Sequence, residues 1–73
     1  MSLEPRICIS SPPDRDKLVA EIFFGANQWA ELNQEDGTLR LEFYSLPAGE
    51  FWQLSWDETA GALKEARRIL LNE

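Results

Sequence analysis

Hydrophobic and polar residues alternate along several stretches of this chain, with the period of two that is typical of β-strands. The clearest stretches are residues 17–24, 28–35, 38–44 and 51–56, and turn residues separate them. A weaker alternation over residues 6–10 precedes a loop at residues 10–14, where consecutive prolines exclude both a helix and a strand ladder. The pattern therefore predicts four clear strands and one short one.

The period changes after residue 56. Ala60, Leu63, Ala66 and Leu70 recur at helical spacing, and Ile69 and Leu71 widen the apolar stripe. Either Asp57, or Ser55 with Glu58 three residues later, can cap the helix start. Basic residues near the end complement the helix dipole. We predict a helix over residues 57–71.

These elements predict an α+β fold: an antiparallel β-meander of four to five strands packed on one C-terminal α-helix. The 73 residues are expected to form a single domain, 1–73. One helix covers one sheet face, and the other face is expected to meet solvent.

The turns predict how the strands pair. A type I′ turn at Asp36-Gly37 places Leu32 opposite Leu41. A three-residue loop at residues 25–27, with Asn27 left-handed, places Ile22 opposite Ala30. If the last loop brings Tyr44 opposite Phe51, then Phe43 faces Trp52. The three turns agree on one apolar face, which is expected to be the core: Leu18, Ala20, Ile22, Ala30, Leu32, Leu39, Leu41, Phe43, Trp52, Leu54 and Trp56.

The opposite face carries the candidate partner-binding residues. The same registers align an aromatic row and, beside it, a glutamate row: Phe23, Trp29, Tyr44 and Phe51, then Glu21, Glu31 and Glu42. Like charges directly opposite one another destabilise a sheet, so the glutamate row is the less expected feature. Acidic groups beside exposed aromatics suit a partner rich in arginine and lysine. The alternative is a solvated face on which Lys17 or Arg40 folds over the glutamates.

Net charge narrows the partner class. Thirteen acidic against seven basic residues give a net charge of −6, which disfavours nucleic acids and anionic membranes and favours a basic protein. No apolar run reaches the roughly 18 residues of a membrane span. The first fifteen residues carry no basic start followed by an apolar stretch, so no signal peptide is expected. A lone cysteine, Cys8, fits a reducing compartment. We expect a cytoplasmic protein.

Candidate chemistry is sparse. Histidine is absent, which removes the commonest general base and transition-metal ligand. Cys8 has no histidine to activate it. Glu31 and Glu42 on an open sheet lack the concave pocket that catalysis needs, and strand spacing does not wrap oxygen ligands around a metal. We therefore expect no enzyme, no cofactor and no metal site.

Several stretches carry a resemblance: residues 11–22, Gln28-Trp29-Ala30-Glu31, Leu41-Glu42-Phe43-Tyr44 and the closing amphipathic helix. Together they resemble a group of short bacterial proteins, mostly uncharacterised, some of which are immunity factors of toxin systems. The resemblance implies a bacterial binding protein and assigns no catalytic residue.

Two function classes follow. The first is an immunity-type protein that neutralises a basic protein partner through its open sheet face. The second is a structural or assembly module that forms a homodimer through the exposed aromatic sheet face.

Overall fold

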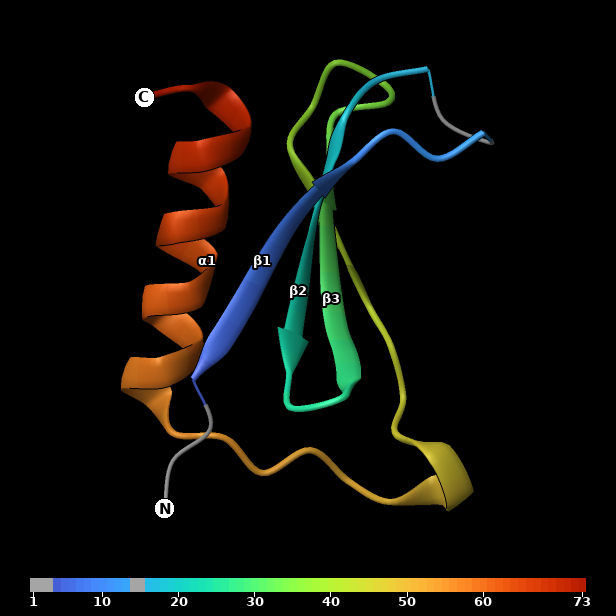
Figure 1. The fold of residues 1–73 in the computed structure, drawn as a ribbon, viewed down its shortest axis with the longest axis vertical. Helices are drawn as coiled ribbons and strands as arrows, with labels where there is room; N and C mark the ends of the chain where they lie inside the picture. Colours follow the sequence, from blue (N-terminus) through green and yellow to red (C-terminus); the bar gives the residue numbers. More distant parts are fainter. Residues whose placement is uncertain (1–3, 14–15) are drawn as a thin grey trace.

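A computed structural model describes residues 4–13 and 16–73 and shows a four-stranded antiparallel sheet with one long helix (Figure 1). The strands are β1 (Pro5–Ser10), β2 (Val19–Phe24), β3 (Asn27–Asn33) and β4 (Arg40–Phe43), followed by a short 3-10 helix, η1 (Pro47–Gly49), and α1 (Trp56–Leu71). Each strand pairs with its sequence neighbour in the order β1-β2-β3-β4. The predicted α+β meander with a C-terminal helix is confirmed. The predicted loop at residues 10–14 ends at Asp14, which lies outside the described residues.

Helix α1 begins and ends at residues whose side chains or backbones suit those positions. Ser55 is the N-cap, and its hydroxyl accepts a hydrogen bond of 3.0 Å from the backbone N–H of Glu58. Asn72 closes the other end in the left-handed conformation. The residues buried against the sheet are Ala62 and Ala66, whose small side chains let the helix backbone approach closely. The helix packs on β1 and β2 and lies beside them in Figure 1.

The β2–β3 register is as predicted, but the turn reaches it differently. Ile22 pairs with Ala30, whereas Phe23 pairs with Gln28, so Trp29 is an extra residue in β3. The loop has two residues, with the positive φ on Gly25, and Asn27 belongs to the strand. A left-handed Asn27 was therefore wrong. A two-residue loop plus a one-residue bulge gives the same pairing beyond the bulge as a three-residue loop.

The β3–β4 register also holds. Leu32 pairs with Leu41, and Ala30 pairs with Phe43. The turn is not type I′, which needs a positive φ at both central residues. Here the backbone N–H of Gly37 donates to Gln34 O at 3.0 Å, and in this turn the positive φ falls on Gly37. The hydrophobic pattern defines this register more strongly than the turn type does.

The predicted strand at residues 51–56 is wrong. Among the described residues, this segment pairs with no strand, and Trp56 is the first residue of α1. The positive φ angles at Ala48 and Gly49 in η1 turn the chain away from β4. The segment then runs below the sheet to the start of α1 (Figure 1). Trp52 attaches this segment to the end of β4, because its indole Nε1–H donates to Tyr44 O at 2.7 Å. Strand β4 is therefore an edge strand.

The core is smaller than predicted because α1 covers only part of the sheet. Its buried members come from β2, β3 and α1: Ala20, Ile22, Phe24, Trp29, Ala30, Leu32, Ala62 and Ala66. Trp52 and Leu54 pack against this cluster and are partly buried. Five residues expected in the core are instead exposed: Leu18, Leu39, Leu41, Phe43 and Trp56. Three of these belong to β4 or directly precede it, at the end of the apolar face that α1 does not reach.

A matched pair of substitutions tests this division of the apolar face. Ile22 is fully buried, so Ile22→Ala is expected to destabilise the fold by about 2–5 kcal/mol. Leu41 retains 40% of its exposure, so Leu41→Ala is expected to destabilise a dilute sample by at most about 1 kcal/mol. Urea denaturation at low protein concentration measures both. Equal losses for the two variants would place Leu41 in the core.

Candidate protein-binding surface

The predicted glutamate row is present across three strands. Glu21 pairs with Glu31, and Glu31 pairs with Glu42, while Cys8 extends the row onto β1. Exposure differs sharply along it, however. Glu42 is exposed and Glu21 half-buried, but Glu31 retains only 5% of its exposure. The middle carboxylate is thus not presented to a partner in this chain.

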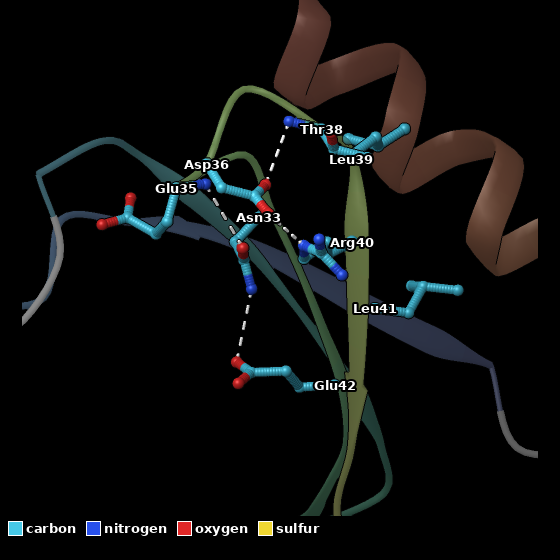
Figure 2. A pocket seen from close by; sticks show the side chains of 8 residues that line it. All are labelled: Asn33, Glu35, Asp36, Thr38, Leu39, Arg40, Leu41 and Glu42. Atoms are coloured by element: carbon cyan, nitrogen blue, oxygen red, sulfur yellow. Dashed lines mark hydrogen bonds and ion pairs between the residues drawn. The ribbon is translucent and has the colours of Figure 1, made fainter.

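Asn33 links two of these carboxylates. Its side-chain Nδ2 donates to Glu31 Oε2 and to Glu42 Oε2, each at 3.3 Å, and Figure 2 shows the bond to Glu42. Its Oδ1 accepts from the backbone N–H of Glu35 at 3.4 Å. Asn33 is itself 2% exposed. A buried amide between the two carboxylates offsets part of their repulsion, so this section of the row also stabilises the fold.

The predicted aromatic row is not formed, because the bulge changes where Trp29 lies. Trp29 joins the core, with its ring edge-on to Phe24 at 5.5 Å and to Phe43 at 5.4 Å between centroids. Phe23 lies opposite Gln28, with the Arg6 guanidinium 4.6 Å from its ring centroid. Only Tyr44 and Phe51 of the predicted row are exposed. The sequence contains no local signal for a bulge at Trp29, because neither glycine nor proline stands there.

The structure instead brings together an apolar strip that we name the β4 strip: Leu39, Leu41 and Phe43. All three are exposed, and Phe43 retains 61% of its exposure. Leu39 and Leu41 point to one side of β4, and Arg40 and Glu42 to the other (Figure 2). An open hollow of about 620 Å³ borders this part of β4 and is lined by residues of both sides, including Leu41 and Glu42. This surface therefore combines apolar and charged groups along one strand.

The backbone N–H and C=O groups of β4 point alternately towards β3 and away from it. The N–H of Tyr44 donates to Trp29 O at 2.9 Å, so Tyr44 directs its backbone groups towards β3. Backbone direction alternates along an antiparallel strand, which means that residues 40, 42 and 44 face β3. The N–H and C=O groups of Leu41 and Phe43 consequently point to the outer edge. In the part of the chain that the structure describes, no strand lies beyond that edge.

The turn before β4 is fixed by Asp36. Its carboxylate accepts from the backbone N–H of Thr38 at 3.1 Å and forms an ion pair with Arg40 Nε (Figure 2). The hydrogen bond from Arg40, followed by that from Thr38, lowers the pKa of Asp36 below its ordinary value of 3.8. The ion pair orients Arg40 at the start of β4.

Two further features of the described residues concern membranes and metals. Within residues 4–13 and 16–73, no helix is long and apolar enough to span a bilayer. Over the same ranges, no three His, Cys, Asp or Glu side chains gather closely enough to hold a metal ion.

The Asp36–Arg40 pair predicts a titration result. Replacing Arg40 with Gln removes the largest cause of the lowered pKa, so the pKa of Asp36 is expected to rise towards 3.8. Because the folded-state pKa is depressed, the pair stabilises the fold above the unfolded pKa, and this contribution disappears as the pH falls through the folded pKa. Carboxyl chemical shifts followed by NMR between about pH 2 and 6 measure both chains. An unmoved Asp36 titration in Arg40→Gln would contradict the pairing.

The Asn33 bridge predicts a stability loss. Asn33→Ala leaves two neighbouring carboxylates without their shared donor, and we expect a loss of about 1–3 kcal/mol in urea denaturation. Gln53→Ala, at an exposed position outside the sheet, is the control and should be nearly neutral. The loss should shrink when Glu42 is also changed to Gln, since one negative charge then disappears. A full loss in that background would show that Asn33 acts independently of Glu42.

Comparison with known proteins assigns no family. No family model, no curated protein and no solved structure matches this chain. The resemblance to short bacterial proteins, with its implied immunity-type role, stays a prediction.

Proposed function

We propose that this protein is a non-catalytic binding module that takes up an extended segment of another polypeptide along β4. The observation that carries the proposal is the coincidence, on one strand, of an outer edge with outward-pointing backbone groups and an exposed apolar strip. Edge strands of this kind template the addition of a further strand. Backbone hydrogen bonds then supply affinity, and the alternating side chains supply selectivity.

The two edges of the sheet support this proposal by their difference. The β1 edge begins with Pro5, which has no backbone N–H, and α1 packs against this strand. A proline protects a sheet edge from unwanted pairing. Strand β4 has neither a proline nor a covering helix among the described residues. Evolution commonly shields edges, so an unshielded apolar edge is best explained by use.

The proposed surface revises the one expected from sequence. Trp29 and Glu31 are buried in this chain, so they are not among its contact residues. Glu42 remains, because it lies on β4 itself, and Tyr44 directly follows the strand. Phe51 is 88% exposed and lies on the segment that follows η1. Glu21 and Phe23 belong to β2 and are not part of the β4 surface.

A basic protein partner is a second candidate. Its support is the net charge of −6 together with the exposed carboxylates beside β4, Asp36 and Glu42. Charge of this kind steers a basic partner and raises its association rate. An immunity-type role in a bacterial cytoplasm would be one instance. Such binding weakens as salt screens the charges, whereas apolar strand addition persists.

Capture on immobilised protein tests the proposed surface. The immobilised chain is incubated with an extract of the source organism to which isotope-labelled copies of the chain are added, and bound polypeptides are quantified by mass spectrometry. Phe43→Lys places a charge in the β4 strip, and retention of the main bound species is expected to fall by about tenfold or more. Leu41→Lys should lower retention in the same way. Because this variant leaves Phe43 in place, it shows that the loss does not come from a broken contact between Phe43 and Trp29.

Ile69→Lys is the matched control, because Ile69 is an exposed apolar residue on α1. Circular dichroism confirms that each variant is folded. Retention that is the same for all four proteins would contradict a binding surface on β4.

A further inference from the structure

If β4 binds an extended segment, as proposed above, the charge pattern of β4 indicates which segment it is. We propose that the segment added to β4 is β4 of a second copy of this chain, in antiparallel orientation. The twofold axis lies between the two copies of Leu41, which pair with each other. The two four-stranded sheets then join into one continuous sheet of eight strands.

Backbone geometry restricts how two copies can pair. Leu41 and Phe43 direct their backbone groups outward, as the bond from Tyr44 N to Trp29 O requires. Residues with outward groups pair only with residues of the same kind in the other copy. One residue must therefore pair with the same residue of the other copy, and the twofold axis lies between these two. We name the axis by that residue. Five positions along the strand and its start, residues 39 to 43, are available.

Charge selects one of these positions. With the axis at Leu41, Arg40 of each copy lies opposite Glu42 of the other, giving two cross-strand pairs of opposite charge. An axis at residue 40 places arginine opposite arginine, and an axis at residue 42 places glutamate opposite glutamate. Axes at residues 39 and 43 give no pair of opposite charges between Arg40 and Glu42. Opposite charges across a ladder stabilise it and like charges destabilise it, so Leu41 is the favoured centre.

The apolar side chains match in the same register. Leu41 meets Leu41 of the second copy, and Leu39 meets Phe43 in both directions. Each exposed member of the β4 strip thereby gains an apolar neighbour across the new ladder. Charged pairs lie on one side of the joined sheet and apolar pairs on the other, because Leu39 and Leu41 point away from Arg40 and Glu42 (Figure 2) and side chains alternate along a strand.

Arg40 keeps donors for these bonds while it holds its partner within the chain. Arg40 bonds Asp36 through Nε, and a guanidinium carries five N–H donors. Glu42 is exposed on β4 and accepts from Asn33 through Oε2. The side chain of Arg40 retains 61% of its exposure, which leaves it accessible from the β4 edge.

Complementary charge reversal tests the register directly. In Arg40→Glu, the strand carries glutamate at both positions, and in Glu42→Arg it carries arginine at both. Each variant alone should self-associate at least about tenfold more weakly than the natural chain, because two attractive pairs become repulsive. Mixed together, the two variants should form a one-to-one heterodimer, since every facing pair is again glutamate with arginine. Sedimentation and native mass spectrometry, from about 10 µM to 1 mM protein, measure these states.

Two controls accompany the experiment. Arg67→Glu makes the same charge change at an exposed position on α1 and should leave self-association unchanged. The double variant Arg40→Glu with Glu42→Arg restores opposite charges and should recover the homodimer. Circular dichroism confirms the fold of each chain, which matters because Arg40 also bonds Asp36.

Each other result overturns the proposal in an identifiable way. A natural chain that stays monomeric to about 1 mM excludes the second copy as occupant. The proposed function then survives if capture from the extract still depends on Phe43 and Leu41, and fails if it does not. A dimer that Arg40→Glu and Glu42→Arg leave intact uses another surface or another axis. Single variants that remain monomeric when mixed show that the Arg40–Glu42 pairing does not join the copies.

Discussion

The width of one helix governs this structure. A helix with its side chains is about 10–12 Å across, and neighbouring strands lie about 4.8 Å apart, so one helix covers about two strands. Helix α1 packs on β1 and β2 of a four-stranded sheet. The apolar face of β4 is consequently left uncovered, although its residues follow the alternation of a core strand. The exposed β4 strip is a result of this geometry and not of an unusual composition.

A second consequence concerns how a chain of 73 residues obtains its core. Small domains have little buried area to spare. The bulge in β3 adds Trp29 to the core, and the segment after η1 brings Trp52 and Leu54 against it. The indole of Trp52 is fixed by its bond to Tyr44 O at the end of β4. Residues 51–55 thus close one end of the core instead of extending the sheet, and β4 remains an edge within the described part of the chain.

The predicted pairings of Ile22 with Ala30 and of Leu32 with Leu41 are correct, although both turns differ from the turn types from which the pairings were derived. A slip of one residue would turn every apolar side chain to the other face, which makes the register strongly specified. The details of the turns were not predictable in the same way. A two-residue loop with a bulge and a three-residue loop satisfy the same pattern, and only the position of Trp29 distinguishes them.

The candidate site was predicted in part, for a related reason. Periodicity placed Glu21, Glu31 and Glu42 in one row, because rows follow from register alone. It could not show that Glu31 is buried and bonded to Asn33, since burial depends on groups distant in sequence. Alternation at residues 51–56 was equally misleading, because a partly buried extended segment shows the same pattern as a strand. Comparing the width of one helix with four strands would have indicated the open half of the apolar face.

We propose that the outer edge of β4 is open in a single chain and is closed by an added strand. Amide hydrogen exchange, followed residue by residue, distinguishes these two states. In a dilute sample, the N–H groups of residues 40 and 42, which face β3, should exchange slowly, while those of Leu41 and Phe43 should exchange quickly. At high protein concentration, Leu41 and Phe43 should become protected as well. Protection of Leu41 and Phe43 already in the dilute monomer would rule out an open edge, because the edge would then be closed within the chain itself.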